Sequence, residues 1–493
     1  MSETIFTRAD EAILDGVLDN FTELVKIPRP SKHEQQVAIF LQKFFESRGL
    51  DVVRDKFNNV VAEIPASSDR QNSPLTILQG HTDMVCVARD DVNFEPTRDG
   101  IKLIRDDKFL YADGTSLGAD DGIGVAEILY LVDNRDAFSH GRIRAIFTAD
   151  EEQGMSGASN LDEKFLADAD FMINCDSETF GEIIVGCAGC VHVTFKRELH
   201  YVRPDTKLFT NMAITVDGLR GGHSGGEISC GRINALKVAV QIMRRIGQRG
   251  KIRLAKLTGG KAFNAIPDRA EFVISTDVHA ADVEKICANV ETGLRKIFAA
   301  TDPNVKIETK VVPRPEKVLH AKDFDCLSNL MTLIHSGVFL MNPVDCTQVF
   351  ASANLGVAQT DDNFVTLKLL PRANDDEILT ELMDGFSQAA KLCAFECEMS
   401  TPTPAWNFNA NSRLLKFAEE IFAQQNGHAP EIQTTHMGVE PSFFAKKNPA
   451  LDIISIGTTN EHIHTPNERL HLDTVAPHVK FIVGLLEKIA EPT

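Results

Sequence analysis

The feature of this sequence that most constrains its fold is an alternation of helical and strand-like segments at both ends of the chain. Over roughly the first 185 residues, helical spacing of apolar residues alternates with short apolar runs bounded by turn residues. The expected helices are 10–26, 33–48 and a segment after Gly122, and the expected strands are 51–65, 75–79, 142–148 and 171–175. Such alternation predicts an α/β domain with a mixed, mostly parallel sheet flanked by helices.

The pattern changes near residue 190 and returns near residue 400. In between, 191–195 and 211–216 alternate like strands with one exposed face. The expected helices of this middle block are 231–245, 281–299, 325–335 and 376–394, and those of the last block are 411–425 and 474–490, around a strand at 451–456. We therefore predict a catalytic domain split between residues 1–190 and 400–493. The inserted α/β block, residues 191–399, is expected to be one domain or two similar ones in tandem.

The net charge of −19 limits the partners that this chain can have. Proteins that bind nucleic acid carry a basic patch, and anionic membrane surfaces attract basic segments. No apolar run reaches the ~18 residues of a membrane span, and the polar, acidic start Met1-Ser-Glu-Thr-Ile is unlike a signal peptide. We expect a partner that is neither a nucleic acid nor a membrane.

Ten cysteines are scattered along the chain without a repeating framework. In a chain of 493 residues this usage is typical of reduced thiols in a cytoplasmic protein. Cys187 and Cys190 form a single CxxC pair, and the next cysteine, Cys230, is too distant to extend it to a four-sulfur zinc site. Buried strand cysteines are therefore favoured over a redox or metal pair.

Five clusters of His, Asp and Glu stand out, four of them after expected strands and one before an expected helix. The clusters are Gln79-Gly-His81-Thr-Asp83, Gly118-Ala-Asp120-Asp121-Gly, Thr148-Ala-Asp-Glu151-Glu152, Asn174-Cys-Asp176-Ser-Glu178 and Asn460-Glu-His462-Ile-His464-Thr-Pro-Asn-Glu468. In an open α/β sheet, ligand sites form at the carboxyl ends of the strands. The clusters can therefore converge although the first and the last are far apart in the sequence.

The residue types of these clusters are those that bind zinc. Imidazole and carboxylate are zinc ligands, and two ions can share a bridging carboxylate. Neighbours on an extended segment point opposite ways, so one of Glu151 and Glu152 can be a ligand while the other acts as a base. The carboxylate of a His-x-Asp pair can accept from the second ring nitrogen and fix the tautomer. Acidic residues at strand ends are usually solvated turn residues, and a single His-x-Asp is more often a surface pair, so only the combination of the clusters indicates a site.

Together the clusters resemble the dinuclear zinc exopeptidases related to aminoacylase and peptidase T. That family has H-x-D, then Asp followed by an acidic or amide residue and Gly, then E-E-x-G, then Asp, then His, and all five elements occur here in order. Within the family, the chain is most similar to the Xaa-His dipeptidases. The stretches that carry this similarity are Gly80-His-Thr-Asp-Met-Val, Thr115-Ser-Leu-Gly-Ala-Asp-Asp-Gly, Gly218-Leu-Arg-Gly-Gly-His-Ser-Gly-Gly, Asn264-Ala-Ile-Pro, His436-Met-Gly-Val-Glu440 and His464-Thr-Pro-Asn-Glu-Arg.

The resemblance implies a role for each matching residue. Two Zn²⁺ ions, with Co²⁺ or Mn²⁺ as alternatives, would be bridged by Asp120. His81 and Asp176 would complete one site, and Glu152 and His464 the other. The implied catalytic residues are the base Glu151, Asp83, which orients His81, and His223, which stabilises the oxyanion. The implied substrate-binding residues are Asn264, Asn354, Arg372 and Glu440, and a guanidinium such as that of Arg372 suits a C-terminal carboxylate.

Two positions depart from the dipeptidase pattern. Asp121 stands where the dipeptidases often have Asn, and His462 lies two residues before His464 as a competing ligand. His464 is preferred because its His-Thr-Pro-x-Glu context matches the family. The inserted block would be a lid and dimerisation domain that carries His223, either within one chain or across a homodimer. The implied reaction is metal-dependent hydrolysis of Xaa-His and other dipeptides.

Other functions are possible on the residues alone. Gly222-His-Ser224-Gly-Gly226 fits the G-x-S-x-G elbow of serine hydrolases, which needs a strand running into the serine and a helix starting directly after it. Here Glu227-Ile-Ser-Cys-Gly delays the expected helix. A binding protein without activity would lack a ligand or the base, and none is missing. The main alternative is another exopeptidase or an N-acyl amino-acid deacylase of the same family.

Overall fold

The computed structural model describes residues 8–343 and 346–492. The chain divides into two compact units, each with its own hydrophobic core. Unit 1 comprises residues 1–186, 408–434 and 439–493, and unit 2 comprises residues 187–407 and 435–438. The second unit is thus inserted into the first in sequence, and the short segment 435–438 returns to it from the C-terminal part of the chain.

Unit 1 is built on an eight-stranded mixed sheet with the order β1-β2-β6-β3-β7-β24-β8-β23. The four strands β6, β3, β7 and β24 pair in parallel, and antiparallel strands flank them. The strands are β1 (Asp51–Arg54), β2 (Val60–Ile64), β3 (Thr76–His81), β6 (Ile143–Thr148), β7 (Phe171–Asn174), β8 (Glu182–Cys187), β23 (Glu431–Thr435) and β24 (Asp452–Ser455). The residues of β3, β6 and β7 are all buried, as expected for parallel strands covered on both faces.

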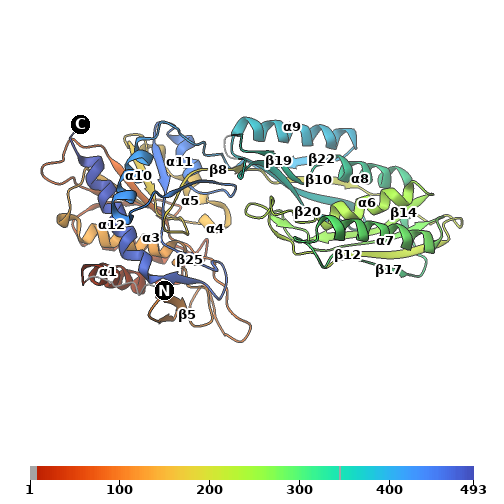
Figure 1. Cartoon of the computed structure of the whole chain (residues 1–493), viewed down its shortest axis with the longest axis horizontal. Helices are drawn as coiled ribbons and strands as arrows, with labels where there is room; N and C mark the ends of the chain where they lie inside the picture. Colours follow the sequence, from red (N-terminus) through yellow and green to blue (C-terminus); the bar gives the residue numbers. More distant parts are fainter. Residues whose placement is uncertain (1–7, 344–345, 493) are drawn as a thin grey trace. The chain divides into compact units, whose positions relative to one another are not determined.

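Helices and a small second sheet complete unit 1. Helices α1, α3 and α12 pack against one another, and α10 packs on α12 (Figure 1). The helices are α1 (Arg8–Val25), α2 (Gln35–Glu46), α3 (Ala119–Asp133), α4 (Glu151–Gly154), α5 (Ser156–Asn160), α10 (Arg413–Asn426), α11 (Pro441–Lys447) and α12 (Leu472–Ala490), with 3₁₀ turns η1 (Arg135–Ala137) and η2 (Glu163–Phe165). The small sheet has the order β25-β26-β5-β4 and consists of β4 (Leu103–Arg105), β5 (Phe109–Ala112), β25 (Asn460–Glu461) and β26 (Arg469–His471).

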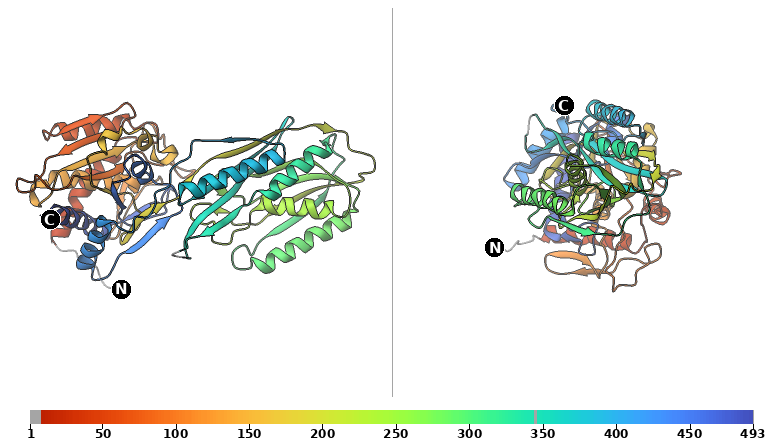
Figure 2. Two further views of the ribbon diagram at one scale, coloured as in Figure 1. Left: turned by 90° about the horizontal axis from the view of Figure 1, so that it is seen from above. Right: turned by 90° about the vertical axis from the view of Figure 1, so that its right-hand side faces the viewer.

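Unit 2 contains one continuous sheet with four helices on the same face (Figures 1 and 2). The main path is β17-β12-β16-β14-β20-β21-β10-β22, with β19 beside β20 and β9 beside β21. The strands are β9 (Gly189–Cys190), β10 (Val193–Glu198), β12 (Thr210–Asp217), β14 (Ile252–Gly260), β16 (Ala270–Thr276), β17 (Lys306–Val311), β19 (Gly337–Met341), β20 (Val349–Thr360), β21 (Phe364–Ala373) and β22 (Glu396–Met399). The helices are α6 (Ala235–Gly247), α7 (Ala280–Ile297), α8 (Ala321–Leu333) and α9 (Asp376–Leu392). Two short ribbons add β11 (Tyr201–Val202) with β18 (Val318–Leu319), and β13 (Gly222–His223) with β15 (Ala265–Ile266).

The predicted α/β fold class, with a mixed sheet flanked by helices, is confirmed. One expected strand is wrong, because 51–65 forms the antiparallel hairpin β1–β2. The Asp55 carboxylate accepts hydrogen bonds from the amides of Phe57 and Asn59, and Asn58 has a left-handed φ of 69°. These are typical turn interactions of Asp and Asn, and here they outweigh the apolar residues on either side.

Helix α3 begins at Ala119, earlier than the expected start after Gly122. Asp120 and Asp121 have non-helical backbone angles within this first turn, so their side chains are not placed as in a regular helix. No helix in the described part of the chain combines the length and the apolar character needed to cross a bilayer.

Candidate metal centre

The first four clusters converge because three of them follow neighbouring parallel strands. His81 is the last residue of β3, Glu151 follows β6, and Asp176 follows β7. The register places His81 opposite Thr148 on β6, and Gln79 opposite Asn174 on β7. Parallel strands in this register end at the same edge of the sheet, which is where ligands bind in open α/β sheets.

Two groups of potential metal ligands meet at this edge. In the first, His81 Nε2 lies 3.0 Å from Asp120 Oδ1 and 3.3 Å from Asp176 Oδ1. In the second, His464 Nε2 lies 3.0 Å from Asp120 Oδ2 and 2.9 Å from Glu152 Oε2. Within each group the ligand atoms lie within 4.8 Å of one another. The two oxygens of Asp120 face different histidines, which is the arrangement of a bridging carboxylate.

The donor set suits divalent metal ions. Each Nε2 atom faces oxygens from two carboxylates, although a neutral imidazole nitrogen can bond only one of them. Nitrogen and carboxylate oxygen are also the ligands of catalytic zinc. The part of the chain that the structure describes therefore holds two adjoining groups that could each bind an ion, with Asp120 in both.

The electrostatics show how strongly these side chains interact. Burial lowers the pKa of His464, but its hydrogen bonds to Asp120 and Glu152 outweigh this effect and raise the pKa to about 11. Burial, aided by the repulsion of Asp120, raises the pKa of Asp176 to about 6. The site thus concentrates negative charge that a cation can neutralise.

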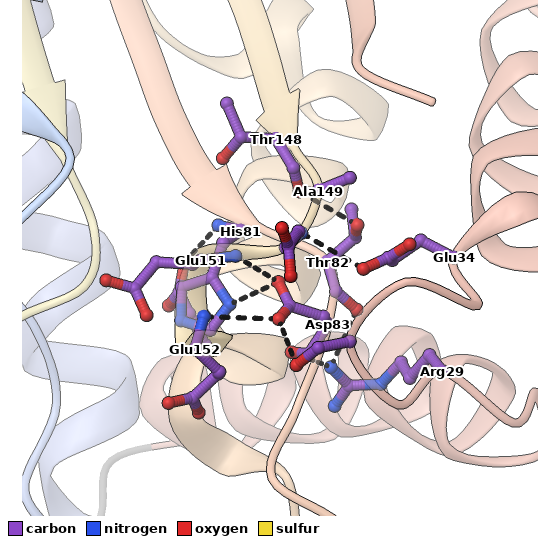
Figure 3. A network of polar contacts seen from close by, with 12 residues as sticks. Arg29, Glu34, His81, Thr82, Asp83, Thr148, Ala149, Glu151 and Glu152 are labelled. Atoms are coloured by element: carbon purple, nitrogen blue, oxygen red, sulfur yellow. Dashed lines mark hydrogen bonds and ion pairs between the residues drawn. The ribbon is translucent and has the colours of Figure 1, made fainter. Parts of the chain in front are cut away.

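Asp83 is buried and connects His81 to the segment after β6 (Figure 3). Its Oδ1 atom lies 3.4 Å from His81 Nδ1 and accepts a hydrogen bond of 2.9 Å from the Glu151 amide. Its Oδ2 atom accepts from the Glu152 amide at 3.2 Å and from Ser31 Oγ at 2.8 Å. Asp83 therefore lies beside His81 and holds the backbone of the two glutamates, while its role in orienting His81 stays a prediction.

Glu151 and Glu152 point to different partners, but they open helix α4 and do not lie on the extended segment that was expected from the sequence. Glu152 faces His464, whereas Glu151 lies outside both groups of potential ligands. Among the described residues, the Glu151 carboxylate has no hydrogen bond or ion pair. Burial, followed by the charges of Asp176, Glu440 and Glu152, raises its pKa well above the usual range, although His81 opposes the shift. Glu151 thus stands beside the two ligand groups as a buried carboxylate that neither group uses.

His464, rather than His462, joins the ligand groups. Both residues have left-handed backbone angles, with φ of 59° and 57°. His462 lines a separate cavity with Arg89, Tyr111 and Glu468. The preference for His464 is thus supported by the geometry.

Two predicted residues of unit 2 lie side by side. His223 on β13 pairs with Ala265 on β15, next to Asn264. His223 and Asn264 line one shallow cavity with Arg220 and Lys261. The His223 amide donates to Glu227 Oε2 at 3.0 Å, and its Nδ1 atom accepts from the Gly225 amide at 3.3 Å.

Asn354 and Arg372 come from the neighbouring strands β20 and β21. Asn354 Nδ2 donates to the carbonyls of Phe263 and Ala265, both at 2.8 Å, so it shapes the loop that presents Asn264. Arg372 is buried and donates to the His436 carbonyl at 3.4 Å. Its Nε atom has no partner in the described structure, which leaves donor capacity for an anion.

Glu440 lies in unit 1 and is fully buried beneath the sheet edge. Its Oε2 atom accepts from Gln79 Nε2 at 2.7 Å and from Thr148 Oγ1 at 2.6 Å. Burial raises its pKa to about 7. These contacts favour support of β3 and β6 over the direct substrate contact that the sequence suggested.

The segment around Ser224 does not form a nucleophile elbow. Ser224 follows the two-residue strand β13, and helix α6 starts only at Ala235. Its Oγ atom is buried and has no hydrogen-bond partner among the described residues. The base that a serine nucleophile needs is therefore absent from its described surroundings.

Sequence reasoning missed two buried residues that organise the site. The Glu468 carboxylate accepts from the amides of Leu117, Gly118 and Ala119 at 2.7, 3.0 and 2.8 Å, which ties the His464 loop to the Asp120 loop. Arg29 donates to carbonyls on two of the loops. The only signal in the sequence was position, since Glu468 ends the fifth cluster and Arg29 stands between two prolines.

Comparison with known proteins places this chain among peptidases. The sequence profile of peptidase family M20/M25/M40 matches residues 77–488. The chain is 33% identical over 473 residues to the cytosol non-specific dipeptidase of Escherichia coli (strain K12), covering 96% of this chain and 97% of the relative. Its structure is similar to that of aminoacylhistidine dipeptidase from Vibrio alginolyticus, with a TM-score of 0.87, 30% identity and 97% of each chain covered.

A more distant structure shares the fold alone. The aminopeptidase PepT from Bacillus cereus ATCC 10987 has a TM-score of 0.56 at 18% identity, covering 97% of this chain and 99% of that chain. The resemblance inferred from the five clusters is confirmed by the nearly full-length matches above. The chain belongs to peptidase family M20/M25/M40 and is a hydrolase acting on peptide bonds.

Proposed function

We propose that this protein is a dipeptidase that binds two divalent metal ions, Zn²⁺ in the first instance, and cleaves Xaa-His and other dipeptides. The observation that carries the proposal is the position of Asp120, whose two carboxylate oxygens face His81 and His464 separately. The names of the relatives, a non-specific dipeptidase and an aminoacylhistidine dipeptidase, support the substrate class.

The proposed ligands divide into two sets that share Asp120. His81 and Asp176 complete one set, and Glu152 and His464 complete the other. Co²⁺ and Mn²⁺ are alternatives to Zn²⁺, because the nitrogen and oxygen donors suit all three. When bound, such ions polarise the scissile carbonyl and make a water molecule more acidic.

Glu151 is the proposed general base. Its carboxylate accepts a proton from the attacking water, and the same proton then passes to the amine nitrogen that leaves as the peptide bond breaks. Its raised pKa suits both steps, since a strongly acidic carboxyl would hold the proton too weakly to deliver it. Asp83 keeps Glu151 in place through the backbone amide.

Unit 2 supplies the proposed lid residues. We assign oxyanion stabilisation to His223, an exposed histidine on β13 that lies next to Asn264. Arg372 is proposed to bind the C-terminal carboxylate of the dipeptide, while Asn264, positioned by Asn354, binds the substrate backbone. Glu440 remains a candidate for substrate binding, because its Oε1 atom has no hydrogen-bond partner among the described residues, while its Oε2 atom binds Gln79 and Thr148.

Domain roles, assembly and location are part of the same proposal. We propose that residues 1–190 and 400–493 act as the catalytic domain and residues 191–399 as the lid and dimerisation domain of a homodimer; the compact units differ from these bounds at 187–190, 400–407 and 435–438. A cytoplasmic location is supported by the reduced cysteines and by the relative named as cytosolic.

The test is a substrate panel combined with a base variant. Purified protein loaded with zinc, cobalt or manganese is assayed on dipeptides including Xaa-His, on tripeptides and on N-acyl amino acids. Glu151→Gln should lose about 10²–10⁴-fold in kcat while the bound metal, measured by elemental analysis, stays at two per chain. Exposed Glu163 provides the matched control Glu163→Gln, which should behave as wild type.

Three outcomes would contradict parts of this proposal. Near-normal turnover by Glu151→Gln would remove Glu151 as the base. If the protein cleaved only tripeptides or only N-acyl amino acids, it would be another kind of hydrolase of the same family and not a dipeptidase. Metal-replete wild type without any activity would indicate a binding protein.

A further inference from the structure

One short segment near the N-terminus touches three of the loops that carry the proposed metal ligands and base. This segment, residues 29–34, follows helix α1 and is called the brace here. Its Arg29, Ser31 and Glu34 side chains are 2%, 7% and 2% exposed. Polar side chains that are buried to this degree are retained only when they are hydrogen-bonded, so their partners indicate their purpose.

Arg29 joins the loop after β3 to the loop before α3. Its Nη1 atom donates to the carbonyls of Thr82 and Asp83 at 3.0 and 2.9 Å, and its Nη2 atom donates to the Gly118 carbonyl at 2.5 Å. Figure 3 shows the guanidinium directly beside Asp83. The planar guanidinium thus binds the backbone of two loops, the one after His81 and the one before Asp120.

The rest of the brace reaches the third loop. Ser31 Oγ donates to Asp83 Oδ2 at 2.8 Å. Glu34 Oε1 accepts from the Asp150 amide at 3.0 Å, immediately before Glu151, and from the Lys32 amide at 2.6 Å. The brace is therefore bonded to the loops that contain Asp83, Asp120 and Glu151.

Two glycines, Gly118 and Gly122, lie so close to Arg29 that a larger side chain at either position would collide with its guanidinium. A Cβ atom on Gly118 would lie 2.7 Å from Arg29 Nη2, and one on Gly122 would lie 2.4 Å from it. Gly118 also has a left-handed φ of 71°. Pro28 and Pro30 restrict the backbone on either side of Arg29. At Gly122 the Arg29 guanidinium is the nearest obstacle to a side chain, whereas at Gly118 Met84 Sδ, at 2.6 Å, and the left-handed backbone also favour glycine.

Burying the Arg29 charge is costly, and among the described residues it has no ion-pair partner. Its bonds go to backbone carbonyls, while the nearby carboxylates of Asp83, Glu468 and Asp121 supply the compensating negative field. A planar donor that fixes three carbonyls at set distances has a positional role.

We propose that the brace is a positioning element that preassembles the metal site, holding the loops of Asp83, Asp120 and Glu151 in register before any ion binds. This inference rests on the proposed metal function. It assigns Arg29 as the principal positioning residue, with Ser31 and Glu34 as secondary ones, and none of the three is among the proposed metal ligands.

The test compares Arg29→Lys with a matched buried arginine. Lysine keeps the charge but cannot present two donor nitrogens in a fixed plane. Metal-free Arg29→Lys should show faster hydrogen exchange at residues 82–84 and 117–120, a ~10–100-fold weaker zinc affinity, and an altered Co²⁺ absorption spectrum. Saturating zinc should restore most of the lost activity, because binding selects the assembled loops.

The control is Arg144→Lys in the same unit. Arg144 is also buried but pairs with Glu63 and Asp168, away from the metal loops. This variant should lose stability yet keep wild-type zinc affinity and loop exchange. If Arg29→Lys and Arg144→Lys lost stability equally, with zinc affinity and loop exchange unchanged in both, the brace would be purely structural and the inference wrong.

Two further arms keep the outcome unambiguous. If Arg29→Lys does not fold, Ser31→Ala removes a single bond to Asp83 and should weaken zinc binding in the same direction, by a smaller factor; unchanged affinity there would overturn the inference. If wild type binds no metal, the proposed function fails, and loop exchange in the metal-free variants still decides whether the brace orders these loops.

Discussion

Glu468 shows how a single carboxylate can connect two metal loops. It lies four residues after His464 and accepts hydrogen bonds from the backbone amides of residues 117–119. A fourth, longer hydrogen bond of 3.4 Å comes from the Asp120 amide. The Glu468 side chain is only 2% exposed, so water cannot easily replace it as the acceptor for these buried amides. Its position between the two loops makes it a second connection beside Arg29.

Replacing this carboxylate by an amide should disturb the site. In Glu468→Gln one acceptor oxygen becomes an NH₂ group that faces backbone donors, so we expect a loss of ~1–3 kcal/mol in the free energy of unfolding and roughly tenfold weaker zinc binding. Denaturant titration and competition with a chromophoric chelator measure these effects. Glu461→Gln, in the same loop but paired with Arg469 and His471, should leave zinc affinity unchanged. Equal effects in both variants would exclude the connecting role.

His436 makes the stability of unit 2 depend on pH. Both ring nitrogens are engaged, with Ser352 Oγ at 2.8 Å and Asn374 Oδ1 at 3.0 Å, and burial, with the charge of Arg372, lowers its pKa to about 3. The folded state therefore favours neutral His436, whereas the unfolded chain takes up a proton below about pH 6.5. The contribution of neutral His436 to the free energy of unfolding is complete above that pH. It decreases as the pH falls toward 3, by at most about 1.4 kcal/mol per pH unit.

A variant without this titration tests the effect. His436→Gln should be less stable than wild type at pH 7.5, and the difference should shrink by pH 5 because only wild type loses stability there. Urea unfolding at several pH values, followed by exchange of unit 2 peptides, gives the comparison. His335→Gln, at an exposed position of the same unit, is the control. A constant difference across this pH range would contradict the assignment.

At the level of elements, the N-terminus of α6 illustrates how caps hold unit 2 together. Asn234 Oδ1 accepts from the amides of Leu236 and Lys237, while its Nδ2 atom donates to Ser336 Oγ and the Leu355 carbonyl. We expect Asn234→Ala to lower the free energy of unfolding of unit 2 by ~1–3 kcal/mol. Asn234→Asp retains the cap acceptor and should lose less. Zinc affinity should be unchanged in both, and a loss of zinc binding would show that unit 2 shapes the metal site.

At the level of the whole molecule, metal binding should stabilise the two units unequally. All the proposed ligands lie in unit 1, and each unit has a separate core. Zinc at 100 times its dissociation constant should add about 2.7 kcal/mol to the unfolding of unit 1. Hydrogen exchange with and without a chelator should show this gain in unit 1 peptides alone. Equal gains in unit 2, or a gain that persists in His464→Ala, would contradict it.

The five clusters were predictable because their chemistry is local. Imidazole and carboxylate groups directly after apolar strands indicate a metal site wherever the strands are neighbours, and β6, β3 and β7 are neighbours. The hairpin at 51–65 was missed because its turn interactions compete with apolar residues on both sides. Arg29 and Glu468 were missed because a buried charge looks like a surface charge until its partners are known.

By itself, the amino-acid sequence determined the α/β class, the family and the set of side chains that could bind metal, because these depend on residue type and order. Only the tertiary structure decided which oxygen of Asp120 faces which histidine, that Glu440 lies beneath the sheet, and that residues 29–34 hold three loops together. The physical reason is that hydrogen bonds act over about 3 Å. Partners as far apart as Leu117 and Glu468 reach that distance only when the strands and helices have packed.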